Sequence, residues 1–191
     1  MPLHTPTGSP DSSVGRTEAG VLARQSAGLL VYRPVSDGIE VLAVHPGGPF
    51  FARKDAGVWS IPKGELETSG AKEDESKTSP RIEDPYLAAR REFAEELGQP
   101  APEGDPIELG KVRQAGGKVV HAWALRAEDG AIDTHAVRSN SVEIEWPRGS
   151  GQRLTVPEVD KAAWMSPQTA REKLIPAQVT LVDRLLDRLG I

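Results

Sequence analysis

The sequence contains no cysteine, which excludes disulfide bonds, thiolate zinc sites and a cysteine nucleophile. It also has no apolar run of about 18 residues, the length that a membrane-spanning helix needs. The N-terminal region lacks the apolar segment of a secretory signal, so we do not expect one. We therefore expect a cytoplasmic protein that is not associated with a membrane.

Positive charge and apolar residues are also scarce. Lysine and arginine number 23 against 28 aspartates and glutamates, giving a formal net charge of −5. This balance gives no general attraction to DNA or to an anionic membrane, and we expect neither as a partner. Apolar residues make up 38% of the 191 residues, which is low for a compact domain. Part of the chain is therefore expected to lie outside the packed core.

Two segments account for this low apolar content. Residues 1–23 are rich in proline, glycine, serine and threonine, and they predict a disordered N-terminal tail. Residues 68–82 are polar, charged and aperiodic, and they predict a flexible surface loop. The rest of residues 24–191 is long enough for one domain with a hydrophobic core.

Hydrophobic periodicity predicts strands, then a helix, then more strands and two final helices. The predicted strands cover residues 26–33, 39–45, 58–61, 107–114, 118–126, 142–146, 153–156 and 161–165. The predicted helices cover residues 85–97 and 167–174 and a C-terminal segment with the apolar stripe Val179, Val182, Leu185, Leu186 and Leu189. This order predicts an α+β fold, a sandwich built on a mixed sheet.

The helix over residues 85–97 carries an unusual group of acids. Asp84 is a suitable N-cap and Gly98 a suitable left-handed C-cap. At 100° per residue, Glu95 and Glu96 lie within about 60° of Glu92, so three carboxylates share one face. They repel one another, and Mg²⁺, which prefers hard oxygen ligands, would compensate. Taken alone, the three glutamates are explained more simply by a solvated acidic face, which is very common.

The residues around these acids resemble a known motif. Residues 91–98 (REFAEELG) resemble the core of the Nudix box, G-x5-E-x7-R-E-U-x-E-E-x-G-U, and seven residues separate Glu83 from Arg91 as the box requires. Residues 59–64 (WSIPKG) resemble the strand and loop that open it. The resemblance implies a Nudix hydrolase with an α/β/α sandwich, a mixed sheet and a loop–helix–loop box. The chain is similar to MutT-like predicted NTP pyrophosphohydrolases and to diadenosine tetraphosphate hydrolases.

The sequence departs from the box at two places. Eighteen residues separate Gly64 from Glu83 where the pattern has five, so residues 68–82 are interpreted as an insertion within the box. This leaves open whether Glu83, Glu67 or Glu65 fills the first glutamate position. Gln99 replaces the final aliphatic residue.

The resemblance also implies roles for the residues of the box. Glu95 and Glu96 would be the main ligands of Mg²⁺, for which Mn²⁺ is a possible substitute, and Glu92 would be a third ligand or would position the nucleophile. The backbone carbonyl of Gly64 would complete the metal shell. Arg91 would orient the carboxylates rather than contact substrate.

A glutamate outside the box is expected to add a base or a further ligand. We favour Glu158, which lies six residues before Trp164 in a segment similar to one in diadenosine tetraphosphate hydrolases. Glu143 and Glu145 share one face of a predicted strand and are the alternatives.

Phosphate groups of a substrate need cations. Lys63 lies beside the expected metal loop, where its ammonium could bind a terminal phosphate as a point charge. Arg53, Lys54 and Lys118 are further candidates, although each could equally be ordinary surface charge.

Together these observations predict a Mg²⁺-dependent hydrolase that cleaves a pyrophosphate bond in a nucleoside diphosphate-linked substrate. A dinucleoside polyphosphate or a nucleoside triphosphate is the leading expectation. The alternatives are ADP-ribose, a nucleotide sugar or capped RNA as substrate, or a non-catalytic module that binds a nucleotide. The protein is expected to be a monomer or a homodimer.

Overall fold

The computed structural model describes residues 25–69 and 81–191. The predicted disordered tail, residues 1–23, lies outside this range. So do residues 70–80, the greater part of the predicted loop. Both therefore stay predictions from the sequence.

A mixed six-stranded sheet forms the centre of the fold. The strand order is β10 (Val159–Met165), β2 (Gly38–Pro46), β1 (Gln25–Val35), β7 (Val119–Arg126) and β6 (Ile107–Arg113), and β3 (Lys63–Glu65) also pairs with β1. Strand β1 runs parallel to β7 and antiparallel to β2 and β3. The mixed sheet predicted from the element order is therefore confirmed.

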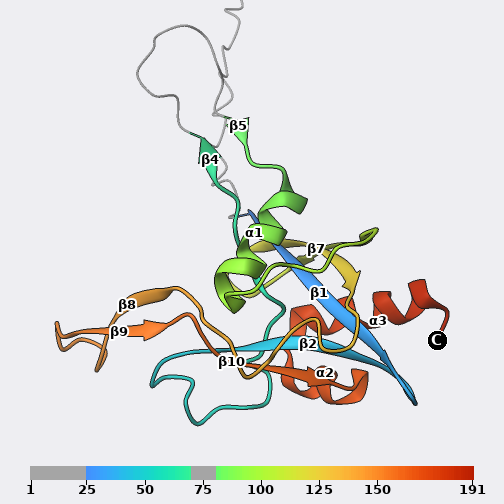
Figure 1. Cartoon of the computed structure of the whole chain (residues 1–191). Helices are drawn as coiled ribbons and strands as arrows, with labels where there is room; N and C mark the ends of the chain where they lie inside the picture. Colours follow the sequence, from blue (N-terminus) through green and yellow to red (C-terminus); the bar gives the residue numbers. More distant parts are fainter. Residues whose placement is uncertain (1–24, 70–80) are drawn as a thin grey trace, which may run out of the picture.

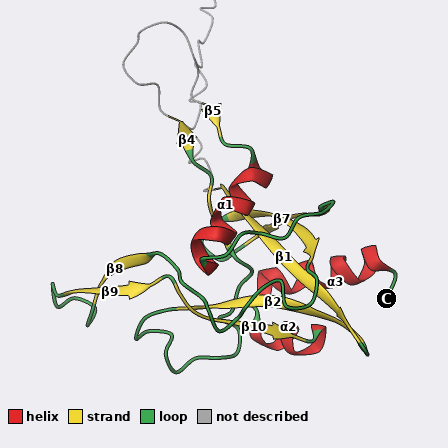
Figure 2. Cartoon of the chain, viewed as in Figure 1, coloured by secondary structure: helices red, strands yellow, loops and turns green. Residues whose placement is uncertain are grey.

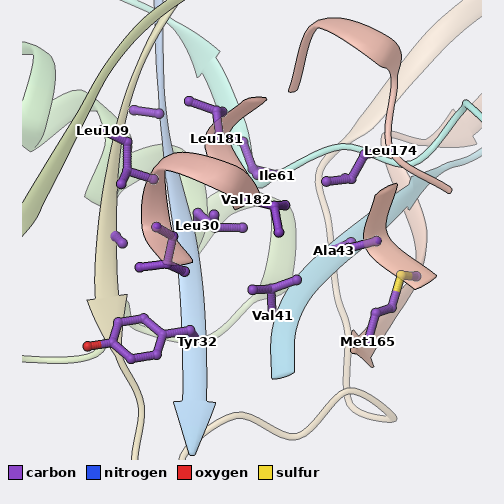
Figure 3. Packing of buried hydrophobic residues seen from close by; sticks show 14 of the residues in the cluster. Leu30, Tyr32, Val41, Ala43, Ile61, Leu109, Met165, Leu174, Leu181 and Val182 are labelled. Carbon is purple, nitrogen blue, oxygen red and sulfur yellow. The ribbon is translucent and has the colours of Figure 1, made fainter. Parts of the chain in front are cut away.

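Helices cover both faces of this sheet, as Figures 1 and 2 show. They are α1 (Pro85–Leu97), α2 (Pro167–Lys173) and α3 (Pro176–Leu189). In β1, Leu29 packs in one cluster with Phe93 of α1, whereas Leu30 packs in a second cluster with Leu181 of α3. Figure 3 shows the second cluster, with Leu30, Leu181 and Val182 close together. Because β1 is buried on both faces, its sequence is a nearly continuous apolar run.

Helix α1 has the predicted bounds because both of its ends are determined locally. The carboxylate of Asp84 accepts hydrogen bonds from the backbone N–H groups of Tyr86 and Leu87, at 2.9 and 3.0 Å. At the other end Gly98 adopts φ 69°, and its N–H donates to the carbonyl of Ala94. A left-handed residue of this kind favours glycine.

The strand predicted over residues 58–61 is wrong. Only two isolated bridges form there, Ser60 with Val44 and Trp59 with Leu174. Ser60 bonds to β2, whereas Trp59 bonds to the backbone beyond α2, so the two residues pair with different elements and no continuous ladder forms. The strand in this region is β3, directly after Pro62.

Two small ladders lie outside the main sheet. Strands β4 (Thr68–Ser69) and β5 (Arg81–Ile82) pair, so the two ends of the predicted loop are joined by backbone hydrogen bonding. Strands β8 (Ser141–Glu145) and β9 (Arg153–Pro157) form a hairpin that extends away from the main sheet in Figure 1. We call residues 141–157 the arm. None of the helices in the described ranges is long and apolar enough to cross a membrane.

Candidate active site

A cleft of about 1280 Å³ opens between α1, β3, the loop after β2 and the arm. Several residues predicted from the sequence line it together, although they come from four different parts of the chain. They are Lys63, Gly64, Glu92, Glu95, Glu96, Lys118 and Glu158. The structure therefore brings acidic and basic candidates to one place.

The apolar side of α1 determines where its acids lie. Phe93 and Leu97 are fully buried in the cluster against β1, so the opposite side of the helix faces the cleft. Glu96 is only 8% exposed, and its Oε2 accepts a hydrogen bond from the backbone N–H of Lys63 at 3.1 Å. This bond ties the helix to β3.

Gly64 lies in close contact with Glu92. A Cβ added to Gly64 would overlap the carboxylate of Glu92. The carboxylate therefore lies directly against the backbone of β3, in the space that any larger residue would fill. Glycine permits this close approach.

Arg91 connects its own helix to Glu83 and to β3. It donates two hydrogen bonds to Glu83, at 3.1 and 2.9 Å, and single bonds to Glu92 at 2.8 Å and Glu95 at 3.3 Å. A fifth bond goes to the backbone carbonyl of Glu65 at 3.2 Å. The guanidinium thus fixes the orientation of the carboxylates.

The three candidates for the first glutamate position lie in different surroundings. Glu83 forms the two-bond pair with Arg91, whose hydrogen bonds lower the pKa of this carboxyl. Glu67 is exposed and lies 3.9 Å from Arg91. Glu65 lines the cleft, with its Oε1 3.6 Å from the ammonium of Lys118. By geometry Glu83 is the partner that holds Arg91.

Burial and repulsion raise the pKa values of two of the acids. Burial raises the pKa of Glu96 to about 7, with Lys63 opposing the shift and the charges of Glu92 and Glu158 adding to it. Burial also raises the pKa of Glu92, which Arg91 partly opposes and Glu95 and Glu158 reinforce. Both groups are therefore harder to ionise than a solvent-exposed glutamate.

These residues fit a divalent metal ion of the Mg²⁺ type. All of the candidate side-chain ligands are carboxylates, the hard oxygen donors that Mg²⁺ prefers, and their mutual repulsion would be relieved by a cation. In the described ranges, no group of three or more histidine, cysteine, aspartate or glutamate side chains is arranged to hold a metal ion by itself. Mg²⁺ is usually bound by one or two carboxylates, with substrate phosphates and water among its other ligands.

Glu158 is the glutamate outside the box that lies beside the others. It lines the cleft, and its charge acts on both Glu92 and Glu96. Glu145 lines the cleft from the arm and accepts a hydrogen bond from the backbone of Gly151. Glu143 does not line the cleft and lies 3.9 Å from Arg153.

Two of the four cations proposed for phosphate binding line the cleft. Lys63 and Lys118 both do so, next to the carboxylates. Arg53 and Lys54 are not among the lining residues. The ammonium of Lys54 lies 3.4 Å from the ring centre of Phe50, a residue that does line the cleft.

Several residues of the cleft were not singled out from the sequence. Phe50, Trp146 and Arg148 line it, from the loop after β2 and from the arm. Phe50 and Trp146 are large aromatic residues within segments rich in glycine and proline, which is a weak signal for a binding loop. The sequence does not indicate that these two distant loops meet.

Comparison with known proteins identifies the chain by its family. The model of the NUDIX domain matches residues 22–185. A search of curated proteins found no significant match.

Solved structures of low sequence identity share the fold. An Ap4A hydrolase from C. elegans aligns with TM-score 0.58 and 20% identity over 88% of this chain and 98% of that one. The NUDIX domain of NrtR from Shewanella oneidensis, complexed with ADP ribose, aligns with TM-score 0.55 and 17% identity over 87% and 88%. A MutT protein from Methanosarcina mazei Go1 aligns with TM-score 0.53 and 20% identity over 88% and 95%.

Proposed function

The chain belongs to the Nudix family, and we propose that it is a Mg²⁺-dependent hydrolase of nucleoside diphosphate-linked substrates. The family typically hydrolyses pyrophosphate bonds. A dinucleoside polyphosphate or a nucleoside triphosphate is the proposed substrate. The observation that carries the proposal is the meeting of Glu92, Glu95, Glu96 and Glu158 in one cleft with two lysines.

Each residue of the site has a chemical task in this proposal. Glu95 and Glu96 would hold the metal ion, together with the carbonyl of Gly64 and with Glu92 as a third ligand. When bound, the ion supplies charge neutralisation at the phosphates and lowers the pKa of water. Glu158 accepts the proton of the attacking water.

The remaining charged residues position the reactants. Arg91 holds Glu92 and Glu95 by hydrogen bonds of 2.8 and 3.3 Å, so that their carboxylates keep one orientation. Lys63 and Lys118 line the same cleft and bind phosphate oxygens as point charges. Holding reactants in a fixed geometry contributes to the rate in its own right.

Turnover in the presence of Mg²⁺ tests the proposal. The panel contains diadenosine tetraphosphate, nucleoside triphosphates, ADP-ribose and a nucleotide sugar, with phosphate release or product formation as the readout. We expect Mg²⁺-dependent hydrolysis that falls at least about 100-fold in Glu95→Gln and Glu96→Gln, because metal ligation contributes several kcal/mol to the transition state.

Glu143→Gln is the matched control. It removes one carboxylate from the arm at a position outside the cleft lining, and it should retain full activity. Unchanged turnover in Glu95→Gln and Glu96→Gln would contradict the mechanism. Nucleotide binding without any turnover in Mg²⁺ or Mn²⁺ would instead indicate a non-catalytic module.

A further inference from the structure

The arm has an apolar face and a polar face. Val142 pairs with Val156 and Ile144 with Leu154, and directly paired residues of an antiparallel ladder lie on the same face. The opposite face carries Glu143, Glu145, Arg153 and Thr155. Val142, Ile144 and Val156 line the cleft. The apolar face of the arm therefore forms part of one wall, to which Glu145 also contributes.

The base of the arm is tied by backbone hydrogen bonds to the helix that carries the carboxylates. The backbone N–H of Asn140, just before β8, donates to the carbonyl of Glu95 at 3.3 Å. The carbonyl of Asn140 accepts a hydrogen bond from the N–H of Glu158, just after β9, at 2.9 Å. Both ends of the arm thus start beside residues of the proposed catalytic site.

The loop after β2 is fixed against the same point. The N–H of Gly47 donates to the carbonyl of Glu158 at 3.0 Å. A Cβ on Gly47 would overlap the carbonyl oxygen of Pro157, so the loop backbone packs directly on the end of β9. This loop carries Phe50, and the space between it and the arm is therefore continuous with the carboxylate site.

Two aromatic side chains are exposed within this space. Phe50 is 56% exposed and Trp146 is 36% exposed, and both line the cleft. Phe51 packs edge-on against Phe50, with ring centres 4.8 Å apart, and also lines the cleft. Exposed single apolar residues are ordinary, but several gathered in one concave site are typical of a binding surface.

We propose that the arm is the nucleobase-binding element of the enzyme, with Trp146 stacking on the base and Phe50 bounding the same space. This rests on the proposed function, because it assigns the other end of the nucleotide whose phosphates meet the carboxylates and lysines. A nucleobase is flat and aromatic, and tryptophan binds such rings by stacking whatever their hydrogen-bonding edge. The larger ring system of a purine gains more from stacking than a pyrimidine, so purine nucleotides are the favoured class.

Calorimetric titration in Mg²⁺ tests this assignment without any need for turnover. The probes are AMP, CMP and ribose 5-phosphate, which keeps the sugar and phosphate but lacks a base. We expect wild type to bind AMP more tightly than CMP and ribose 5-phosphate. Trp146→Ala should weaken AMP binding about 10-fold or more, and Trp146→Phe should retain most of it because its ring still stacks.

Two controls separate stacking from general damage. Thr155→Ala changes the opposite face of the arm and should bind AMP as wild type does. Ribose 5-phosphate should bind Trp146→Ala and wild type equally. An equal loss for both ligands, or no loss for AMP, would overturn the assignment. So would a change of oligomeric state in Trp146→Ala without a change in AMP binding, because the apolar face would then be a contact between two copies of the chain.

The outcome also separates this inference from the proposed function. If AMP binding depends on Trp146 but no substrate is hydrolysed, the arm assignment holds and the catalytic proposal fails. If hydrolysis depends on Glu95 but Trp146→Ala binds AMP normally, the arm assignment alone fails.

Discussion

At the carboxylate end of the cleft, Arg91 holds Glu83, Glu92 and Glu95, and Glu96 is almost completely buried. At the arm end, Phe50 and Trp146 are exposed. The arm's two-stranded ladder also stands apart from the main sheet. One end is crowded and charged, and its carboxylates are held by Arg91 or by the backbone of Lys63. The other is open, and its aromatic side chains come from the loop after β2 and from the arm.

This difference between the two ends of the cleft indicates that they have different tasks. Chemistry needs reacting groups held in a fixed geometry, which the hydrogen bonds and close packing of α1 and β3 provide. Recognition of a substrate group can be carried by exposed side chains on loops placed by a rigid scaffold. Changes at the carboxylate end should therefore act on kcat, and changes at the arm should act on substrate affinity.

Gly64→Ala tests the crowded end most severely. The added Cβ would overlap the carboxylate of Glu92, so Glu92 or β3 must move. A displacement of about 1 Å at a catalytic group can cost roughly 100-fold in rate, and we expect a loss of this size in kcat. Ala163→Gly is the control, because it changes a strand away from the cleft lining and should leave kcat unchanged. Gly57→Ala is unsuitable as a control, because the positive φ of Gly57 would strain any side chain there. A normal kcat in Gly64→Ala would show that the carboxylate end of the cleft is less rigid than its packing indicates.

Glu96→Gln should make the metal-free protein more stable at pH 8. Burial raises the pKa of Glu96 to about 7, so the folded state binds this proton more tightly than the unfolded state does. The contribution of the protonated group is present at low pH and is lost as the pH rises through about 7. Glutamine stays neutral, and the shift corresponds to a gain of at most about 3 kcal/mol at pH 8.

Thermal unfolding in a metal chelator at pH 5 and pH 8 measures this effect. The difference in Tm between Glu96→Gln and wild type should be larger at pH 8 than at pH 5. The same measurement on Glu143→Gln, which changes an exposed carboxylate on the arm, should show no such dependence on pH. Equal Tm differences at both pH values would contradict a raised pKa of Glu96 in the folded protein.

Arg148→Ala should have the smallest effect, at the open end. Arg148 lines the cleft from the arm, whereas Arg153 lies outside its lining. An exposed cation contributes little to binding, so KM for a polyphosphate substrate should rise about two- to five-fold in Arg148→Ala with kcat unchanged. Arg153→Ala removes the same charge and should leave KM unchanged. Equal effects of the two substitutions would mean that only the net charge of the arm matters.

The features that could be predicted from the sequence are those that depend on residues close together in the chain. The bounds of α1 follow from Asp84 and Gly98, which cap the helix within a few residues. The family resemblance depends on the spacing of Glu83, Arg91 and the three glutamates, all within one short segment. The structure shows that this spacing places Arg91 within hydrogen-bonding distance of Glu83.

Contacts between distant segments could not be predicted in the same way. Trp59 and Ser60 read as a strand, but their hydrogen bonds go to two different elements, which no local pattern records. Lys54 is close in sequence to the cleft loop, yet its ammonium lies over the ring of Phe50. Trp146 reaches the cleft because Asn140 and Glu158 join the base of the arm to α1, and these bonds appear only in the folded chain.

Steady-state kinetics with Mg²⁺ on the best substrate of the panel tests the division of the cleft most directly. Glu95→Gln should lower kcat at least about 100-fold with little change in KM, because Glu95 is proposed to hold the metal ion that acts on the reacting phosphate. Trp146→Ala should raise KM about 10-fold or more and leave kcat within about threefold of wild type. If Trp146→Ala lowers kcat as Glu95→Gln does, with KM unchanged, the two ends do not have separate tasks and the account is contradicted.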